Sequence, residues 1–243
     1  MNNYRLNSSQ FQSNINCLLS FKIQQNLDID IKDYCKGNSY NIYDEKEKII
    51  FRVHEKSHID YCCARWWCGP NRGFTMFVND EINNSLFHLN RASCRCDMWC
   101  CFNSCCCNNF LGVFDNYKNL IGKVIQQYSF SSPLFHIVNE NEEVLAKVVG
   151  PPCPCRCCYD MSFKIFSVYE ENVQNNESLL KNENNNFHVC GTINKIWDMS
   201  TKQDTNMDHE NCVITFSKQM NSNFKILNLA SALLINVMYF ENS

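Results

Sequence analysis

The sequence has little charge and little glycine, and both shortages exclude functions. Only 19% of the 243 residues are charged, the formal net charge is −3, and seven glycines are present. Because nucleic-acid affinity depends on neutralising phosphates with clustered lysine and arginine, we do not expect a nucleic-acid partner. The few dispersed glycines do not form a phosphate-binding loop.

We also expect no secretory signal, since the first residues lack a basic start and a continuous apolar stretch. We therefore expect the 18 cysteines to meet a reducing cytosol, where thiols persist. A chain of this length, with 45% hydrophobic residues, can bury a core without disulfides.

Most of the cysteines fall into two short runs. Adjacent cysteines cannot easily form disulfides that link distant parts of a fold, because each disulfide needs its own partner cysteine at the right Cα separation. Such runs more often carry lipid or metal. The first run comprises Cys94, Cys96, Cys100, Cys101, Cys105, Cys106 and Cys107, and the second comprises Cys153, Cys155, Cys157 and Cys158.

Short runs of β-branched and aromatic residues, separated by polar turns, follow from residue 39 onward. This pattern is typical of antiparallel strands. About ten to twelve strands are expected to close or split into a barrel or a sandwich. The predicted strands lie at 40–43, 49–53, 74–78, 85–89, 110–114, 123–128, 135–138, 144–149, 162–169, 187–191, 195–198 and 212–216.

The two ends of the chain differ from this middle part. Residues 1–36 are rich in Asn, Gln and Ser, carry only a weak helical pattern at 15–27, and are interpreted as a loosely ordered arm before a domain at 37–243. Residues 223–240 predict a helix that is apolar on every side. A membrane span needs ~20 predominantly apolar residues, so this shorter run favours a helix buried inside protein.

Several motifs in one order resemble the phospholipid scramblase family. The matching segments are CCARWWCGPNRGFT at 62–75, LNR at 89–91, IGKVIQ at 121–126, GP at 150–151, CRCC at 155–158, GTINKIW at 191–197 and MYFE at 238–241. They are collinear over nearly all of the chain after residue 37.

The resemblance implies a mainly β fold similar to tubby-like proteins, a closed antiparallel barrel of twelve strands around a central hydrophobic C-terminal helix. It also implies a lipid transporter-type activity rather than an enzyme, namely calcium-dependent, ATP-independent, bidirectional movement of phospholipids between leaflets. The expected location is the cytosolic face of the plasma membrane. Membrane phospholipids and further copies of the chain are the expected partners. The alternative is an acyl-anchored lipid-binding or signalling adaptor that does not scramble lipid.

The resemblance further implies covalent palmitate on the first cysteine run. The palmitoylation candidates are Cys100, Cys101, Cys105, Cys106 and Cys107. An alternative is a zinc site built from Cys96, Cys100, Cys155 and Cys158. Unmodified thiols in a partly buried loop are the third reading.

An acidic stretch at 208–219 corresponds to the family's calcium-binding loop. It keeps Asp208 and Glu210, but Val213 and Gln219 stand where a typical loop has glycine and a bidentate acid. Any calcium affinity should therefore be weak, and a solvated turn before a strand is an equal interpretation.

Overall fold

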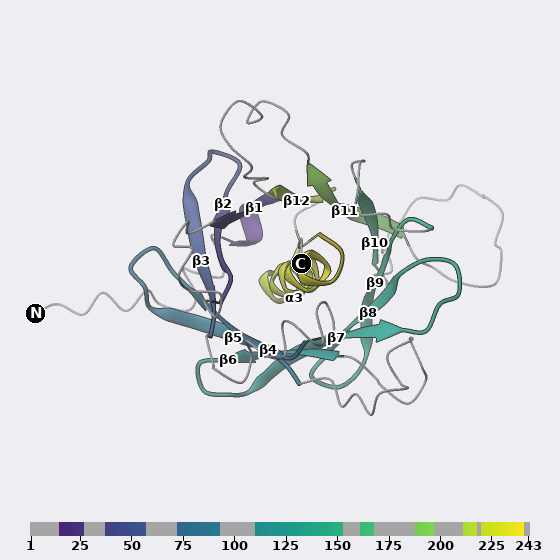
Figure 1. Ribbon diagram of the computed structural model, residues 1–243, viewed down its shortest axis with the longest axis horizontal. Coiled ribbons are helices and arrows are strands. Elements are labelled where there is room, and N and C mark those ends of the chain that lie inside the picture. Colours follow the sequence, from purple (N-terminus) through teal and green to yellow (C-terminus); the bar gives the residue numbers. More distant parts are fainter. Residues whose placement is uncertain are drawn as a thin grey trace, which may run out of the picture.

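The described part of the chain is a closed antiparallel barrel with one helix inside it (Figure 1). The computed structural model describes residues 15–26, 37–56, 72–92, 110–152, 161–167, 188–196, 211–217 and 220–240. Within them twelve strands each pair with their neighbours in sequence, and β1 pairs with β12 to close the ring. The predicted fold class is confirmed.

The strands and the helix have the following bounds. The strands are β1 (Ser20–Asn26), β2 (Ser39–Tyr43), β3 (Ile49–Glu55), β4 (Phe74–Asn79), β5 (Ser85–Arg91), β6 (Phe110–Asp115), β7 (Leu120–Gln127), β8 (Leu134–Asn139), β9 (Val144–Val149), β10 (Ser162–Ser167), β11 (His188–Ile196) and β12 (Asn211–Phe216). The helix α3 (Ser222–Ile235) continues into the π-helical turn η3 (Asn236–Phe240).

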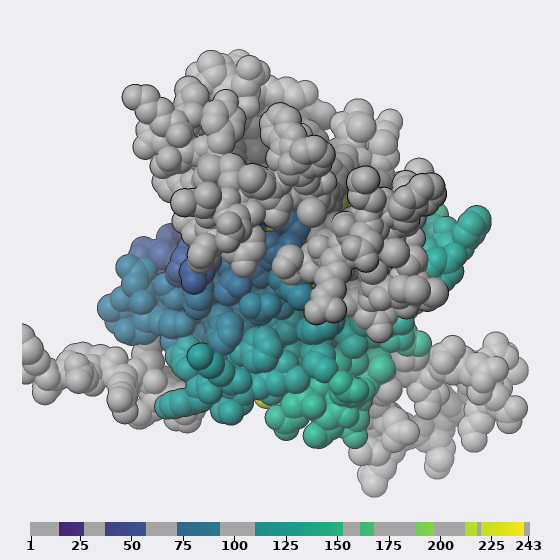
Figure 2. All heavy atoms as spheres, turned by 60° about the horizontal axis from the view of Figure 1, so that its bottom comes forward, coloured from purple at the N-terminus to yellow at the C-terminus, as the bar shows by residue number. Residues whose placement is uncertain are grey.

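Alternation along each strand explains why the sheet closes around a core. In β4, Phe74, Met76 and Val78 are buried, while Thr75 and Phe77 between them are half-buried on the outer face. Successive side chains of a strand point to opposite faces, so every strand contributes one apolar row to the interior. Figure 2 shows the outer face formed by the blue and teal strands as a continuous surface.

The helix fills the interior that these rows enclose. Every residue of α3 except Asn223 is buried. Edge-to-face aromatic contacts join the helix to the wall, with Phe224 against Phe216 and Phe240 against Phe163. At its start, the Asn221 side chain accepts a hydrogen bond from the Asn223 backbone N–H, which caps the helix. A helix that is apolar on all sides thus finds apolar partners on all sides.

One part of the sequence prediction was wrong. Residues 20–26, assigned to a loosely ordered arm, form β1 and seal the barrel against β12. Phe21 and Ile23 are buried in the core, and the polar residues between them face outward. The predicted strands at 187–191 and 195–198 are also one strand, β11.

Four hairpins close with the same turn. Asp44, Asp80, Asp115 and Asn139 each accept, through one side-chain oxygen, hydrogen bonds from the backbone N–H groups two and four residues later. The residue three positions after each has a φ of 58–65°. Aspartate and asparagine favour such local turns.

The antiparallel order gives the barrel two distinct ends. We call the end that carries these four hairpins the turn end. The opposite end, where β1, β3, β5, β7, β9 and β11 finish, is called the connection end. The helix starts at the turn end, where Phe224 meets Phe216, and finishes at the connection end, where Phe240 accepts a hydrogen bond from Lys195.

Gly122 in β7 provides a test of the helix packing. A Cβ atom there would lie 2.9 Å from Leu227 Cδ2 on the helix and would also meet the Val138 carbonyl oxygen. We expect Gly122→Ala to lower the free energy of unfolding by about 1–3 kcal/mol through overpacking, measured by chemical denaturation.

Gly112→Ala is the matched control, because its Cβ would meet only the end of the Phe114 ring within 3.0 Å. That half-buried ring can move aside, so the loss should be smaller. Equal losses in both variants would contradict a tight fit between β7 and the helix.

Candidate functional site

The residues predicted to bind palmitate or metal lie outside the described part of the chain. They are Cys96, Cys100, Cys101, Cys105, Cys106, Cys107, Cys155, Cys158, Asp208 and Glu210. The described strand ends on either side of them all lie at the same end of the barrel. β5 ends and β6 begins at the connection end, and so do β9 and β10, and β11 and β12. The strand ends between which both cysteine runs fall are therefore at the same end of the barrel, with β7 and β8 between the two pairs.

Buried charge gathers at this same connection end. Arg72 precedes β4, and its Nε lies 3.4 Å from Glu55 Oε1 at the end of β3. The second oxygen of Glu55 accepts a hydrogen bond from the Asn38 backbone N–H at 3.1 Å. Both side chains of this ion pair are almost fully buried, so the pair fixes the ends of β2, β3 and β4 to one another.

Arg91 at the end of β5 adds a second buried guanidinium. Its Cζ lies 6.0 Å from the Phe74 ring centroid, which is within cation–π range. The pKa of Arg91 is lowered to about 10, mainly by burial and secondly by the positive charge of Arg72. The side chain therefore stays charged at neutral pH.

Lys195 near the end of β11 contacts the end of the helix. Its Nζ donates a hydrogen bond to the Phe240 carbonyl oxygen at 3.1 Å and lies 5.4 Å from the Phe240 ring centroid. The carbonyl end of a helix carries partial negative charge, which a nearby cation stabilises. Three buried cations, Arg72, Arg91 and Lys195, thus lie at the connection end, and Lys195 contacts the end of the helix.

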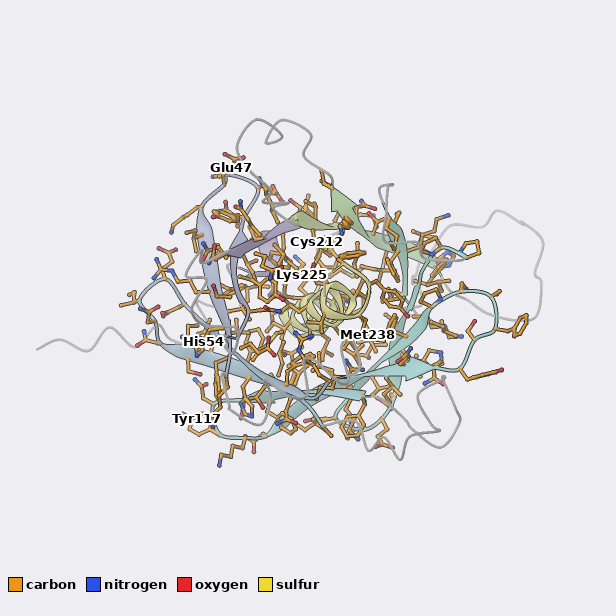
Figure 3. All side chains as sticks on the ribbon, in the orientation of Figure 1. Glu47, His54, Tyr117, Cys212, Lys225 and Met238 are labelled. Carbon is orange, nitrogen blue, oxygen red and sulfur yellow. The ribbon has the colours of Figure 1, made fainter. Side chains whose placement is uncertain are left out.

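A fourth buried cation, Lys225, holds the helix at the turn end (Figure 3). Its Nζ donates hydrogen bonds to the carbonyl oxygens of Ile15 at 3.0 Å, Asn16 at 2.8 Å and Leu18. These carbonyls belong to the chain that leads into β1, so the lysine fastens the first strand to the last helix. Burial lowers the pKa of Lys225.

Two of the three described cysteines, Cys190 and Cys212, are core residues. Burial raises the pKa of Cys190 to about 11 and that of Cys212 to about 12, which keeps both thiols neutral at physiological pH. Cys17 is exposed. Within the described ranges, no three His, Cys, Asp or Glu side chains are grouped as a metal site would require.

The helix is also the one described segment whose length and composition would allow it to cross a bilayer. In the structure 89% of its apolar window, taken within Ser222–Phe240, is buried in the barrel. The core helix of a soluble protein meets the same length and composition criteria, so this segment is assigned to the core. The sequence prediction of a buried helix is confirmed.

The sequence interpretation did not identify the structural roles of Lys225 and Arg91. The sequence shows Lys225 as a lone lysine in an otherwise apolar helix, which could have indicated a buried hydrogen-bonded role. The three carbonyls that accept its hydrogen bonds, however, lie more than 200 residues away in the sequence. Arg91 was visible only as part of a family motif.

Lys225→Met should loosen β1. Three carbonyl oxygens, of which that of Ile15 is buried, lose their shared donor, so we expect the free energy of unfolding to fall by about 1–3 kcal/mol. Amide exchange should accelerate across residues 20–26, measured by hydrogen–deuterium exchange. Lys164→Met, at an exposed position on β10, is the control and should change stability by less than about 0.5 kcal/mol. Unchanged exchange in β1 of Lys225→Met would refute this role.

The buried thiols predict a pH dependence. A folded-state pKa raised above the ordinary 9.0 makes a contribution to stability that is complete below pH 9.0 and disappears as the pH rises through the folded value. The free energy of unfolding in reductant should therefore fall from about pH 9 to 11, and fall less steeply in Cys212→Ala. Parallel pH curves for the two proteins would contradict the assignment.

Comparison with known proteins agrees with this architecture. The family model described as Scramblase matches residues 11–242. Phospholipid scramblase 1 of Homo sapiens is 30% identical over 203 residues, which are 84% of this chain and 57% of that protein. Phospholipid scramblase 2 of Bos taurus is 29% identical over 201 residues, 83% of this chain and 61% of that protein.

The chain thus spans less than two thirds of these two relatives. Phospholipid scramblase family member 5 of Homo sapiens is 25% identical over 206 residues, 84% of this chain and 67% of that protein. No solved structure matches the chain. The family match runs from the segment before β1 to the end of the central helix and so covers the whole barrel, and the chain belongs to the Scramblase family.

Proposed function

We propose that the protein takes part in bidirectional, ATP-independent movement of phospholipids between membrane leaflets, triggered by calcium. The observation that carries this proposal is the family match across barrel and helix together, with relatives that bear the name phospholipid scramblase. The activity is of a transporter type and involves no covalent chemistry. The proposed location is the cytosolic face of the plasma membrane.

The barrel limits how such movement can occur. A polar headgroup needs a hydrated path across ~30 Å of hydrocarbon. The described interior offers no such path, because apolar rows from the strands pack directly on the helix. A route for lipid therefore lies outside the barrel interior, either along the outer wall or between several copies of the chain.

Attachment through palmitate is part of the proposal. One acyl chain holds a protein only marginally on a membrane, whereas two or more hold it stably, at about 0.8 kcal/mol per buried methylene. The acceptors proposed are Cys100, Cys101, Cys105, Cys106 and Cys107. They fall between the end of β5 and the start of β6, so the chains would hold the connection end near the bilayer.

The metal proposals rest on sequence patterns alone. Asp208 and Glu210, which precede β12, are proposed as weak calcium ligands. Zinc held by Cys96, Cys100, Cys155 and Cys158 is the alternative use of the cysteines. The observation that favours zinc is that the strands flanking both cysteine runs end at the same end of the barrel.

A second candidate function is an acyl-anchored lipid-binding or signalling adaptor. The observation that favours it is the enclosure of the helix, which would have to leave the core before it could span a bilayer. In this case the protein binds the membrane surface and moves no lipid.

Reconstitution into vesicles distinguishes the two functions. Purified protein is placed in vesicles that carry a fluorescent phospholipid, and a membrane-impermeant quencher is added with calcium or with a chelator. Lipid movement predicts that inner-leaflet probe becomes accessible in the presence of calcium. Protein-free vesicles, and vesicles with the Asp208→Asn/Glu210→Gln variant, are the controls. If the protein stays on the vesicles while the inner-leaflet probe remains protected, the adaptor function replaces the scramblase function.

A further inference from the structure

The connection between β7 and β8 carries two aromatic side chains into solvent. Tyr128 is 69% exposed and Phe130 is 97% exposed. The strands are paired up to Gln127 and Leu134, and the Gly150 N–H donates to the Pro133 carbonyl oxygen at 2.8 Å. The six residues 128–133 therefore form a short loop at the connection end that is anchored by paired strands on both sides. We call this loop the tip.

This tip lies within an unusually uncharged stretch. No Asp, Glu, Lys, Arg or His occurs between Lys123 and His136. The tip itself is Tyr-Ser-Phe-Ser-Ser-Pro, in which small hydroxyl side chains separate the rings. Aromatic residues beside small polar ones suit the boundary between headgroups and acyl chains, where one part of the loop is apolar and the other stays hydrated.

The hairpins at the opposite end of the barrel, the turn end, are acidic. The four hairpins of the turn end, residues 44–48, 80–84, 115–119 and 139–143, contain nine acidic residues and three lysines. Cytosolic leaflets are negatively charged, so they repel the turn end.

We propose that the tip formed by Tyr128 and Phe130 inserts into the interface of an anionic phospholipid membrane, with the connection end of the barrel facing the bilayer. This inference relies on the proposed function only for the presence of a membrane. It assigns a lipid-contact site to residues that lie apart from the predicted acyl acceptors. It also sets the orientation of the barrel, with the helix axis directed toward the bilayer and the acidic hairpins directed away.

Tyr117 offers a matched control at the opposite end. It is 86% exposed and also sits in a hairpin, but its backbone N–H is bound by Asp115, and the turn belongs to the acidic end. Figure 3 shows it at the periphery of the barrel, far from the helix. The same aromatic-to-serine change at this position removes a comparable ring without touching the proposed site.

The experiment measures binding of the full, unacylated chain to vesicles of phosphatidylcholine and phosphatidylserine by flotation. We expect the Tyr128→Ser/Phe130→Ser variant to bind about tenfold or more weakly than the unchanged protein, because two rings no longer leave water. Tyr117→Ser should bind like the unchanged protein. Thermal melts of both variants should match, since the altered rings are exposed.

A second measurement reports on insertion directly. Phe130→Trp and Tyr117→Trp are compared for the change in tryptophan emission when vesicles containing bromine-labelled lipid are added, each after subtraction of the signal of the unchanged protein. We expect quenching of the tryptophan at 130 and none of that at 117.

Either of two results overturns the inference: equal binding by the Tyr128→Ser/Phe130→Ser variant and the unchanged protein, or absence of quenching at 130. Loss of a protein partner by that variant, with vesicle binding intact, would reassign the tip to protein recognition and also overturn it. Lipid movement is scored separately after detergent-mediated reconstitution. If no variant moves lipid while only the tip variant loses vesicle binding, the proposed function fails and the docking site stands.

Discussion

The packing of α3 inside the closed barrel is the interaction on which the rest of the structure depends. Each strand turns one apolar row inward, and the helix is buried on nearly every side. Exposing either the inward-facing rows of the strands or the surface of the helix to water would cost about 25 cal/mol per Å² of apolar area. Strand closure and helix burial therefore stabilise one another, and neither is expected to persist alone.

The polar groups of the core fix where the helix sits. At the turn end Lys225 binds the carbonyls that precede β1, and at the connection end Lys195 binds the last helical carbonyl. Buried cations are costly unless they are hydrogen-bonded, so both contacts hold the helix to one position along the barrel axis. They also tie the first and last elements of the chain into one unit.

Much of the fold could be predicted from the sequence, and the failures have physical causes. Alternation in runs such as β4 and β9 is strong enough to mark strands, and a run that is apolar on every side marks a core helix. The length argument for that helix was wrong, because the helix in the structure, Ser222–Phe240, is long enough to cross a bilayer. The sequence did not predict β1, because only Phe21 and Ile23 alternate within an otherwise polar stretch. The hydrogen-bond acceptors of Lys225 could not be predicted from the sequence, since they meet the lysine only when the two ends of the chain come together in the fold. The predicted acyl and metal ligands lie outside the described residues, so their assignments remain proposals.

The central claim is that the helix stays in the barrel when the protein is on a membrane. Hydrogen–deuterium exchange of residues 222–240, followed by mass spectrometry on vesicle-bound protein with calcium, tests it most directly. The account predicts that the helix and the strands β4 to β9 keep the protection they have in solution. Loss of protection in the strands while the helix stays protected would mean that the helix has left the core for the bilayer, and would contradict it.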